Sequence, residues 1–239
     1  SIIPFTSFAN NLEPDESEIK NGGELVSTKL EDYDLFSNNF SDDILIAQYG
    51  EEFDIEPGAD LSGENLSNIN LSNADLRNAN LSGANLKDTN LNEANLSNAN
   101  LSNANLRGSN PKNANLSGAN LSGANLSDAN LNFTNLSNAD LSGANLSDAR
   151  LKQVNLSNAN LSGANLSDAN LFNANLTNAN LSGANLKDTN LNQADLSGAD
   201  LSNADLSLAD LRNTNLSGFD LSGLDLSGSD LTNANLTNA

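Results

Sequence analysis

Carboxylates that recur at a fixed spacing are the first feature of this sequence that could carry chemistry. Aspartate stands two residues after a leucine at five places separated by multiples of 20: Asp88, Asp128, Asp148, Asp168 and Asp188. If residues 20 apart stack as neighbouring strands do, these carboxylates lie about 5 Å apart and could share a hard cation such as Ca²⁺. Repeat duplication explains the same column, and Lys87 and Lys187 stand directly beside two of its members. We therefore expect no metal site.

Catalytic chemistry has little support in the composition. The 239 residues include neither His nor Cys, which excludes the common zinc sites and many pairings of a nucleophile with a base. Ser and Asp are abundant, but they recur at fixed positions of a repeat, so a Ser–Asp pair is more simply a solvated corner of the fold. We expect no enzyme activity, no catalytic residue and no cofactor.

The net charge of −21 is unevenly distributed. Residues 1–60 carry 15 acidic and two basic side chains, residues 61–187 carry eight and seven, and residues 188–239 carry eight and one. An acidic chain of this kind argues against binding to nucleic acid or to anionic membranes. No stretch approaches the ~18 apolar residues of a membrane span, and the N-terminus lacks the pattern of a signal peptide. We expect a cytoplasmic protein, with an envelope, lumenal or extracellular location as alternatives.

A leucine stands at every fifth position through most of the chain. From residue 61 to residue 236, 35 of the 36 positions in this register are Leu, and the exception is Pro111. A small residue dominates two positions before each Leu, and Asn or Asp directly precedes it, which gives the unit A-[ND]-L-x-x. A helix places apolar residues about 3.6 apart and a strand places them two apart, so this period fits neither.

The repeat resembles the pentapeptide-repeat family over residues 59–239, and its Asn-rich units are similar to those of cyanobacterial members. The resemblance implies an all-β fold, a right-handed quadrilateral β-helix (solenoid) with four pentapeptides per coil and therefore about nine coils. It also implies that each Leu and the residue two before it point inward. We expect the Asn before each Leu to turn the corner and to form side-chain ladders. Pro111 lacks an amide hydrogen, so we expect a lost backbone hydrogen bond there.

The two ends of the array pose a capping problem. Residues 1–58 form an irregular acidic N-terminal extension, in which Ser41-Asp42-Asp43 before ILIAQYGEE predicts a short helix. We expect residues 40–58 to cover the first coil, because an open coil exposes apolar side chains and unpaired strand edges. The repeat continues to Ala239 without a polar cap. We expect either a homodimer or end-to-end assembly through the C-terminal coil, or a longer native chain.

One of the four faces differs from the others in its outward residues. This third face, formed by the two residues after Leu71 and after every fourth Leu from there, carries Phe133 and Phe172, the only aromatics that we expect to face solvent in the array. It also carries cations on an otherwise Ser-, Asn- and Gly-rich surface. Aromatic and Arg side chains are the usual anchors of protein interfaces. The candidate interaction face is therefore Lys112, Phe133, Arg150 at its edge, Lys152, Phe172 and Arg212.

Three functions remain open at this point. The first is a non-catalytic scaffold for protein–protein interaction, with partners of unknown identity. The second is DNA mimicry, because the resemblance includes acidic rods that bind DNA gyrase and protect it from quinolones; the nearly neutral body of this array fits that function poorly. The third is an extracellular or envelope structural protein, which the low complexity and the lack of Cys favour.

Overall fold

The computed structural model describes residues 44–46 and 52–239 of the chain. Its first elements are two short antiparallel strands, β1 (Ile44–Ile46) and β2 (Glu52–Asp54), in which Leu45 pairs with Phe53. The short helix predicted after residues 41–43 is therefore wrong for the part that is described, because Ile44–Ile46, in which both isoleucines are β-branched, pairs as a strand. In these described residues we find no helical segment with the length and hydropathy of a membrane span.

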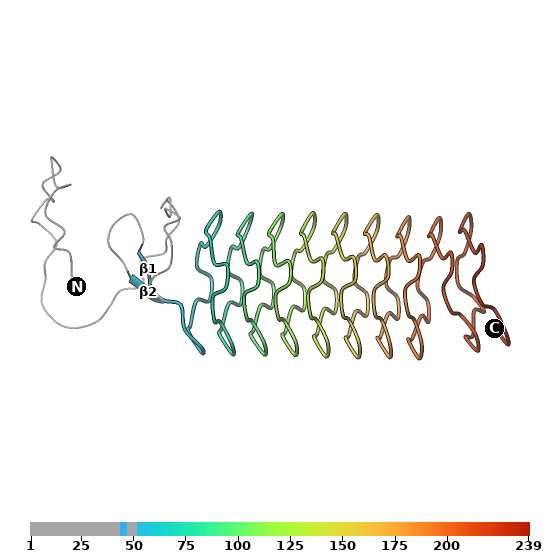
Figure 1. The fold of residues 1–239 in the computed structure, drawn as a ribbon, viewed down its shortest axis with the longest axis horizontal. Coiled ribbons are helices and arrows are strands. Elements are labelled where there is room, and N and C mark those ends of the chain that lie inside the picture. Colours follow the sequence, from blue (N-terminus) through green and yellow to red (C-terminus); the bar gives the residue numbers. More distant parts are fainter. Residues whose placement is uncertain (1–43, 47–51) are drawn as a thin grey trace, which may run out of the picture.

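From residue 55 onward the chain winds into a rod-shaped solenoid (Figure 1). Residues one superperiod of 20 apart form parallel bridges, from Asp60 with Asn80 to Asn215 with Asn235. Through most of the rod, each Leu donates its backbone N–H to the residue 19 positions ahead, as Leu81 does to the carbonyl of Asn100 at 2.7 Å. Neighbouring coils are thus joined by the ladder of a parallel sheet, although each strand is only about one residue long.

Each corner of the coil is a β-turn that follows the leucine. The backbone N–H of Ala79 donates to the carbonyl of Leu76 at 3.1 Å, and Asn78 between them has a φ of +60°. A positive φ at the third residue of the turn is the type II geometry, which favours Gly, Asn and Asp. The Asn that directly precedes each Leu, which we call the corner Asn, makes two further hydrogen bonds. Asn80, for example, accepts from the Ser82 amide at 3.3 Å and donates to the carboxylate of Asp60 at 2.9 Å. The expected side-chain ladders are confirmed. The Asn before each Leu does not itself form the turn but accepts a hydrogen bond from the second residue of the turn, and the positive φ falls two residues after the Leu.

The interior is a continuous stack of leucines and small residues. Leu126 and Leu146, for example, are 1% and 0% exposed, and the alanines two positions before the leucines are buried beside them through most of the array. Ile55 is also buried in this core, at the point where the chain leaves β2 and enters the first coil. The inward direction expected for the Leu and the small residue is confirmed.

Hydroxyl groups at the small inward position are tied to the neighbouring coil. The Oγ1 atoms of Thr89, Thr134 and Thr189 each donate to the backbone carbonyl 23 residues earlier, at 2.6 to 2.7 Å. Ser109 occupies the same kind of position and is fully buried, but its Oγ has no hydrogen-bond partner. It is the one such buried side-chain atom among the residues that the structure describes, and a buried polar group without a partner is destabilising.

Pro111 causes a small local defect in the ladder, as expected. Proline has no N–H to donate to the carbonyl of Asn130, and the described bridges omit the pair Asn110 and Asn130. The disturbance does not spread, because the next turn residue, Asn113, still donates to Asn132 at 3.1 Å. Pro111 is itself buried in the leucine stack, so the core continues through it.

Candidate functional site

The third face brings five of the candidate residues into one region. Phe133, Lys152 and Phe172 follow leucines in successive coils, and the coils are joined by the bridges from Asn130 through Arg150 to Asn170. With a spacing of about 4.8 Å between coils, the two aromatics lie about 10 Å apart along the rod. We call Lys112, Phe133, Arg150, Lys152 and Phe172 the aromatic patch.

Phe133 is held in an unfavourable backbone conformation on the surface. Its side chain is 50% exposed and its φ is +63°, in the left-handed region that bulky residues rarely adopt. Five residues with positive φ in the described chain are neither Gly, Asn nor Asp, and four of them lie on the third face: Glu93, Phe133, Gln153 and Gln193. Nothing in the core requires Phe at this turn, and strain of this kind is found more often at functional surfaces than elsewhere.

The cations of the aromatic patch have no acidic partner among the residues that the structure describes. Arg77, Lys87, Arg107 and Arg212 form ion pairs with aspartates, whereas Lys112, Arg150, Lys152 and Lys187 form none with the residues that the structure describes. Three of these four unpaired cations belong to the aromatic patch. The Nζ of Lys112 lies 5.9 Å from the centre of the Phe133 ring, within the range of a cation–π contact. The patch is therefore a positively charged aromatic spot on an acidic protein.

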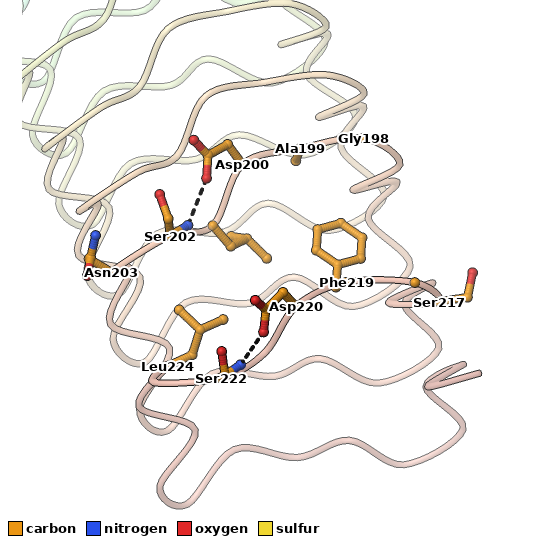
Figure 2. Close-up of a pocket in the computed structure, with 12 residues that line it drawn as sticks. Gly198, Ala199, Asp200, Ser202, Asn203, Ser217, Phe219, Asp220, Ser222 and Leu224 are labelled. Atoms are coloured by element: carbon orange, nitrogen blue, oxygen red, sulfur yellow. Dashed lines mark hydrogen bonds between the residues drawn. The ribbon is translucent and has the colours of Figure 1, made fainter. Parts of the chain in front are cut away.

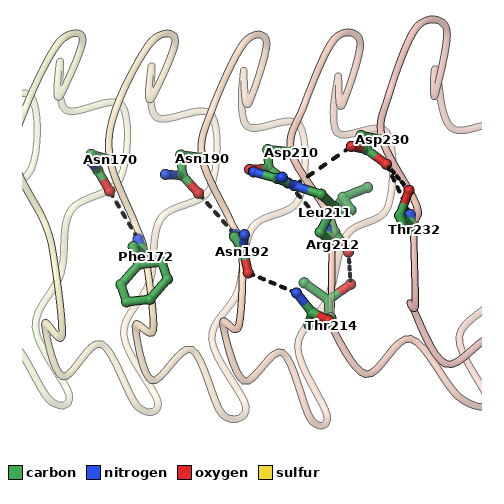
Figure 3. A network of polar contacts seen from close by, with 11 residues as sticks. Asn170, Phe172, Asn190, Asn192, Asp210, Leu211, Arg212, Thr214, Asp230 and Thr232 are labelled. Carbon is green, nitrogen blue, oxygen red and sulfur yellow. Dashed lines mark hydrogen bonds and ion pairs between the residues drawn. The ribbon is translucent and has the colours of Figure 1, made fainter.

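Arg212, the sixth candidate residue, is placed differently. Its guanidinium lies between two aspartates, with Nη2 at 2.6 Å from Asp210 and Nε at 3.6 Å from Asp230 (Figure 3). These contacts raise the pKa of Arg212, chiefly through the hydrogen bond to Asp210. Its charge is therefore satisfied within the C-terminal coils, and the structure does not bring it into the aromatic patch.

Backbone anchoring holds the other patch residues in place. The N–H of Phe172 donates to the side-chain oxygen of Asn170 at 3.2 Å, and Figure 3 shows the ring standing off the coil. The N–H of Lys152 donates to the side chain of Asn132 in the neighbouring coil at 2.9 Å. Arg150 replaces an Asn at the corner, so the Asn ladder stops there, while its backbone N–H still donates to Ala129 at 2.9 Å. These side chains project from a rigid backbone.

The column of aspartates that could have held a cation is accounted for by backbone geometry. All five have φ between +55° and +62°, so each occupies the turn position where Asp, Asn and Gly are favoured. Asp88 lies 3.7 Å from the ammonium of Lys87 and Asp128 lies 3.2 Å from the guanidinium of Arg107. In the part of the chain that the structure describes, no group of three acidic side chains converges as metal ligands would.

Sequence reasoning missed a cleft near the C-terminal end of the rod. Phe219 and Leu224 occupy the small inward position in two consecutive units, where most other units have Ala, Ser or Thr. A cleft of about 480 Å³ opens beside them between two coils (Figure 2). The sequence does contain an indication of this cleft. In residues 219–226, the units Phe-Asp-Leu and Leu-Asp-Leu have a large residue where the repeat normally has a small one.

Comparisons with known proteins give a consistent family signal. The model for pentapeptide repeats matches in eight copies, over residues 58–93, 94–132, 134–171, 169–207 and 204–239. A search of curated proteins found no match. Among solved structures, HetL from the cyanobacterium Nostoc sp. strain PCC 7120, a pentapeptide repeat protein involved in the regulation of heterocyst differentiation, is 38% identical over 76% of this chain and 86% of its own, with a TM-score of 0.36.

Two further solved structures are similar. Rfr23, a pentapeptide repeat protein from the cyanobacterium Cyanothece 51142, is 29% identical over 66% of this chain and 89% of its own, with a TM-score of 0.23. QnrB1, a plasmid-mediated fluoroquinolone resistance protein, is 22% identical in one trypsin-treated form, over 69% of this chain and 80% of its own, with a TM-score of 0.49.

Proposed function

Because the chain belongs to the pentapeptide-repeat family, we propose that it is a non-catalytic scaffold that binds a protein partner through the aromatic patch. The observation that carries this proposal is the concentration of strain, aromatic surface and unpaired cations in one place. Phe133 is half exposed in a disfavoured conformation, and Lys112, Arg150 and Lys152 lack acidic partners among the described residues. Phe and Arg are typical anchors of interfaces.

The chemistry of the patch defines the partner. Two aromatic rings about 10 Å apart, with cations between and beside them, fit an acidic surface that presents apolar side chains. The acidic N-terminal segment of a neighbouring molecule is one candidate, because residues 1–60 carry 15 acidic side chains and several aromatics. A homodimer, or end-to-end assembly through the C-terminal coil, would be a separate contact at the end of the rod.

The finer description of the fold is part of the same proposal. We infer a right-handed quadrilateral β-helix with nine coils for residues 59–239, preceded by the irregular extension of residues 1–58. The 20-residue bridges and the 36 units in register support this count. The segment around β1 and β2 acts as the cap of the first coil, in which Ile55 takes part through its burial in the core.

The two alternatives have less support. A DNA mimic that binds gyrase needs a continuous acidic surface, whereas residues 61–187 have eight acidic and seven basic side chains and include the cationic patch. A gyrase supercoiling assay tests this alternative, since a mimic inhibits the enzyme or protects it from quinolones. An envelope or extracellular structural protein would need no specific patch, and locating the native protein in the cell tests that alternative.

The first prediction concerns Phe133 and Phe172. Phe133→Asn restores the residue type found at equivalent turns, so it should relieve strain and raise the free energy of unfolding by about 1 kcal/mol. Combined with Phe172→Ser, it should reduce partner binding by about 2–4 kcal/mol if both rings are interface anchors. Urea denaturation and quantitative pull-down from cells of the native organism measure the two effects.

Lys187→Ser provides the matched control, because Lys187 lies on another face and forms no ion pair within the described part of the chain. Lys152→Ser should lose bound partner and Lys187→Ser should retain it. If the Phe133 and Phe172 double variant is more stable than the parent but binds the partner more weakly, the two rings serve binding and not folding. If the Phe133 and Phe172 double variant captures the same proteins with the same affinity, the patch is not the binding surface.

A further inference from the structure

The ladder between coils is open on two sides near the C-terminal end. Parallel bridges run in 20-residue steps along the rod, but they are absent between Asp195 and Asn215 and between Asp200 and Asp220 in the described chain. On the remaining two sides the same coils stay joined, as shown by the bridges of Asp205 with Asp225 and of Asp210 with Asp230. The two coils are therefore separated on two adjacent sides and remain hydrogen-bonded on the other two.

The open edges leave a row of backbone groups without their usual partners. Elsewhere in the rod the equivalent amides donate to the carbonyls 19 residues ahead. In the described chain, four amides on the N-terminal side of the opening make no such bond: those of Leu196, Gly198, Leu201 and Asn203. The carbonyls that would have accepted these bonds lie on the C-terminal side of the opening, at Asn215, Ser217, Asp220 and Ser222. Unpaired donors and acceptors of this kind are a template for another strand.

Phe219 lies at the opening, and the size of its ring can account for it. It occupies an inward position that suits Ala, and Figure 2 shows its ring between the segments that carry Asp200 and Asp220. Repulsion between stacked aspartates cannot be the main cause, because Asp205 and Asp225 stack with their bridge intact. The ring is too large for the space between two coils about 4.8 Å apart, so it holds them open.

The cleft combines an apolar interior with an acidic rim. Phe219, Leu201 and Leu224 line its inside, and its volume of about 480 Å³ is in the range of ligand-binding pockets. Asp200 and Asp220 stand at the rim, where each carboxylate accepts a backbone hydrogen bond, from Ser202 at 2.9 Å and from Ser222 at 3.0 Å (Figure 2). Arg212 is the only cation in residues 188–239, and it is already paired.

We propose that this cleft binds a short extended peptide of a partner protein, with alternating apolar and basic residues, which adds as a strand to the open edge. Such a peptide would satisfy the unpaired amides and carbonyls, place every second side chain against Phe219 and direct the intervening cations to Asp200 and Asp220. The chain's own N-terminal segment is a poor occupant because it is strongly acidic. This proposal is independent of the aromatic patch, which lies on other coils.

The probe for this site is the peptide VKVKVK, acetylated and amidated at its ends and labelled for fluorescence anisotropy with the full chain. VEVEVE reverses the charge, and VKVKVK with N-methyl groups on alternate residues cannot pair its backbone. We expect the first peptide to bind and each control to bind at least about tenfold more weakly. Hydrogen exchange at the amides of Leu201 and Asn203 should be fast in the free chain and slow in the complex.

Phe219→Ala is the decisive variant, because it restores the usual small residue and should close the cleft. It should weaken VKVKVK binding at least about tenfold, whereas Val154→Ala, which makes the same kind of change at an inward position of another coil, should leave binding unchanged. If Phe219→Ala does not fold, Asp200→Asn with Asp220→Asn should weaken binding through the lost charge.

Four results would overturn the proposal. They are no binding of VKVKVK at millimolar concentration, equal binding to Phe219→Ala, equal binding of either control peptide, and protection of the Leu201 and Asn203 amides in the free chain. The last result, with a dimer in light scattering, would mean that a second copy covers the cleft. Because the aromatic patch has its own variants, failure here leaves the scaffold proposal to be judged separately.

Discussion

At the scale of the residue, a hydroxyl at the inward position is tolerated where a backbone carbonyl accepts its hydrogen bond. Thr189 meets this condition, since its Oγ1 donates to the carbonyl of Leu166 at 2.7 Å. Ser109 does not, although it stacks in the same column and is equally buried. The two positions differ in this bond and in the methyl group of Thr189, so alanine variants at both test what the bond contributes.

The second prediction follows from this pair. Ser109→Ala removes an unsatisfied buried hydroxyl and should raise the free energy of unfolding by about 1 kcal/mol, whereas Thr189→Ala loses a satisfied one together with a methyl group and should lower it by about 1–2 kcal/mol. Urea midpoints of the two variants measure both changes. A destabilised Ser109→Ala would show that the hydroxyl does have a partner in solution.

At the scale of the element, the corner ladder changes its chemistry along the rod. In most coils the corner residue is Asn, which donates its side-chain N–H to the coil before, as Asn185 does to Asn165 at 3.0 Å. In the last coils Asp takes most of these positions and has no N–H to donate. Like the Asn, each such Asp accepts from the next turn, as Asp195 does from the amide of Ser197 at 3.0 Å and from its hydroxyl at 2.6 Å, but its bonds are made by a carboxylate. The C-terminal coils thus depend on ionised carboxylates.

The third prediction is that acid loosens the C-terminal coils first. The side-chain hydrogen bond from Ser197, followed by its backbone hydrogen bond, lowers the pKa of Asp195 below the usual 3.8, and the pKa of Asp230 is lowered in the same way by Thr232. A pKa that is lower in the folded state contributes stability above the unfolded value, near pH 4, and this stability is lost as pH falls through the folded pKa. The charge of Asp210 acts in the opposite direction on Asp230, but the hydrogen bonds outweigh it.

Hydrogen exchange at pH 7 and pH 2.5, corrected for intrinsic rates, should show lost protection in residues 190–239 and retained protection in residues 90–135, where the corner residues are Asn. Asp195→Asn should reduce the pH dependence, because an amide does not titrate. Equal loss of protection at both ends of the rod would contradict this prediction.

At the scale of the whole molecule, the rod is built from the stacking of each coil on the next. Stability in such a solenoid is a sum of coils and interfaces, so an uncovered end is the weakest point. At the N-terminal end the chain passes from the β1–β2 pair through the buried Ile55 into the first coil. At the other end Leu236 is 42% exposed.

The fourth prediction concerns the N-terminal cap. Deleting residues 1–58 removes Ile55 and uncovers the first leucines, so the shortened rod should aggregate. Deleting only residues 1–43 keeps β1, β2 and Ile55 and should leave the rod soluble. Light scattering after purification compares the two. A soluble, monomeric rod that begins at residue 59 would show that the segment is not a cap.

The five-residue repeat and the lost hydrogen bond at Pro111 could be read directly from the residues, whereas the inward direction of the leucines was an implication of the family resemblance. The repeat and the proline effect could be predicted because the missing N–H of proline and the side chains of the Asn residues act within one unit or between units 20 residues apart. The same reasoning identified Phe133, Lys152 and Phe172 as outward residues of one face. It also predicted a helix after residues 41–43, where helix capping signals were outweighed by strand pairing with Glu52–Asp54.

The three-dimensional structure was needed to see which described cations lack an ion pair, which buried hydroxyl lacks a partner and where the coils separate. Arg212 and Lys152 look alike in the sequence, yet Asp210 and Asp230 neutralise the first. The cleft beside Phe219 depends on whether the coils can close over a large ring, while other stacked aspartates stay bridged. These properties depend on how one coil packs against the next. The volume of a side chain competes there with backbone pairing between coils, and the sequence of a single repeat does not show which of the two prevails.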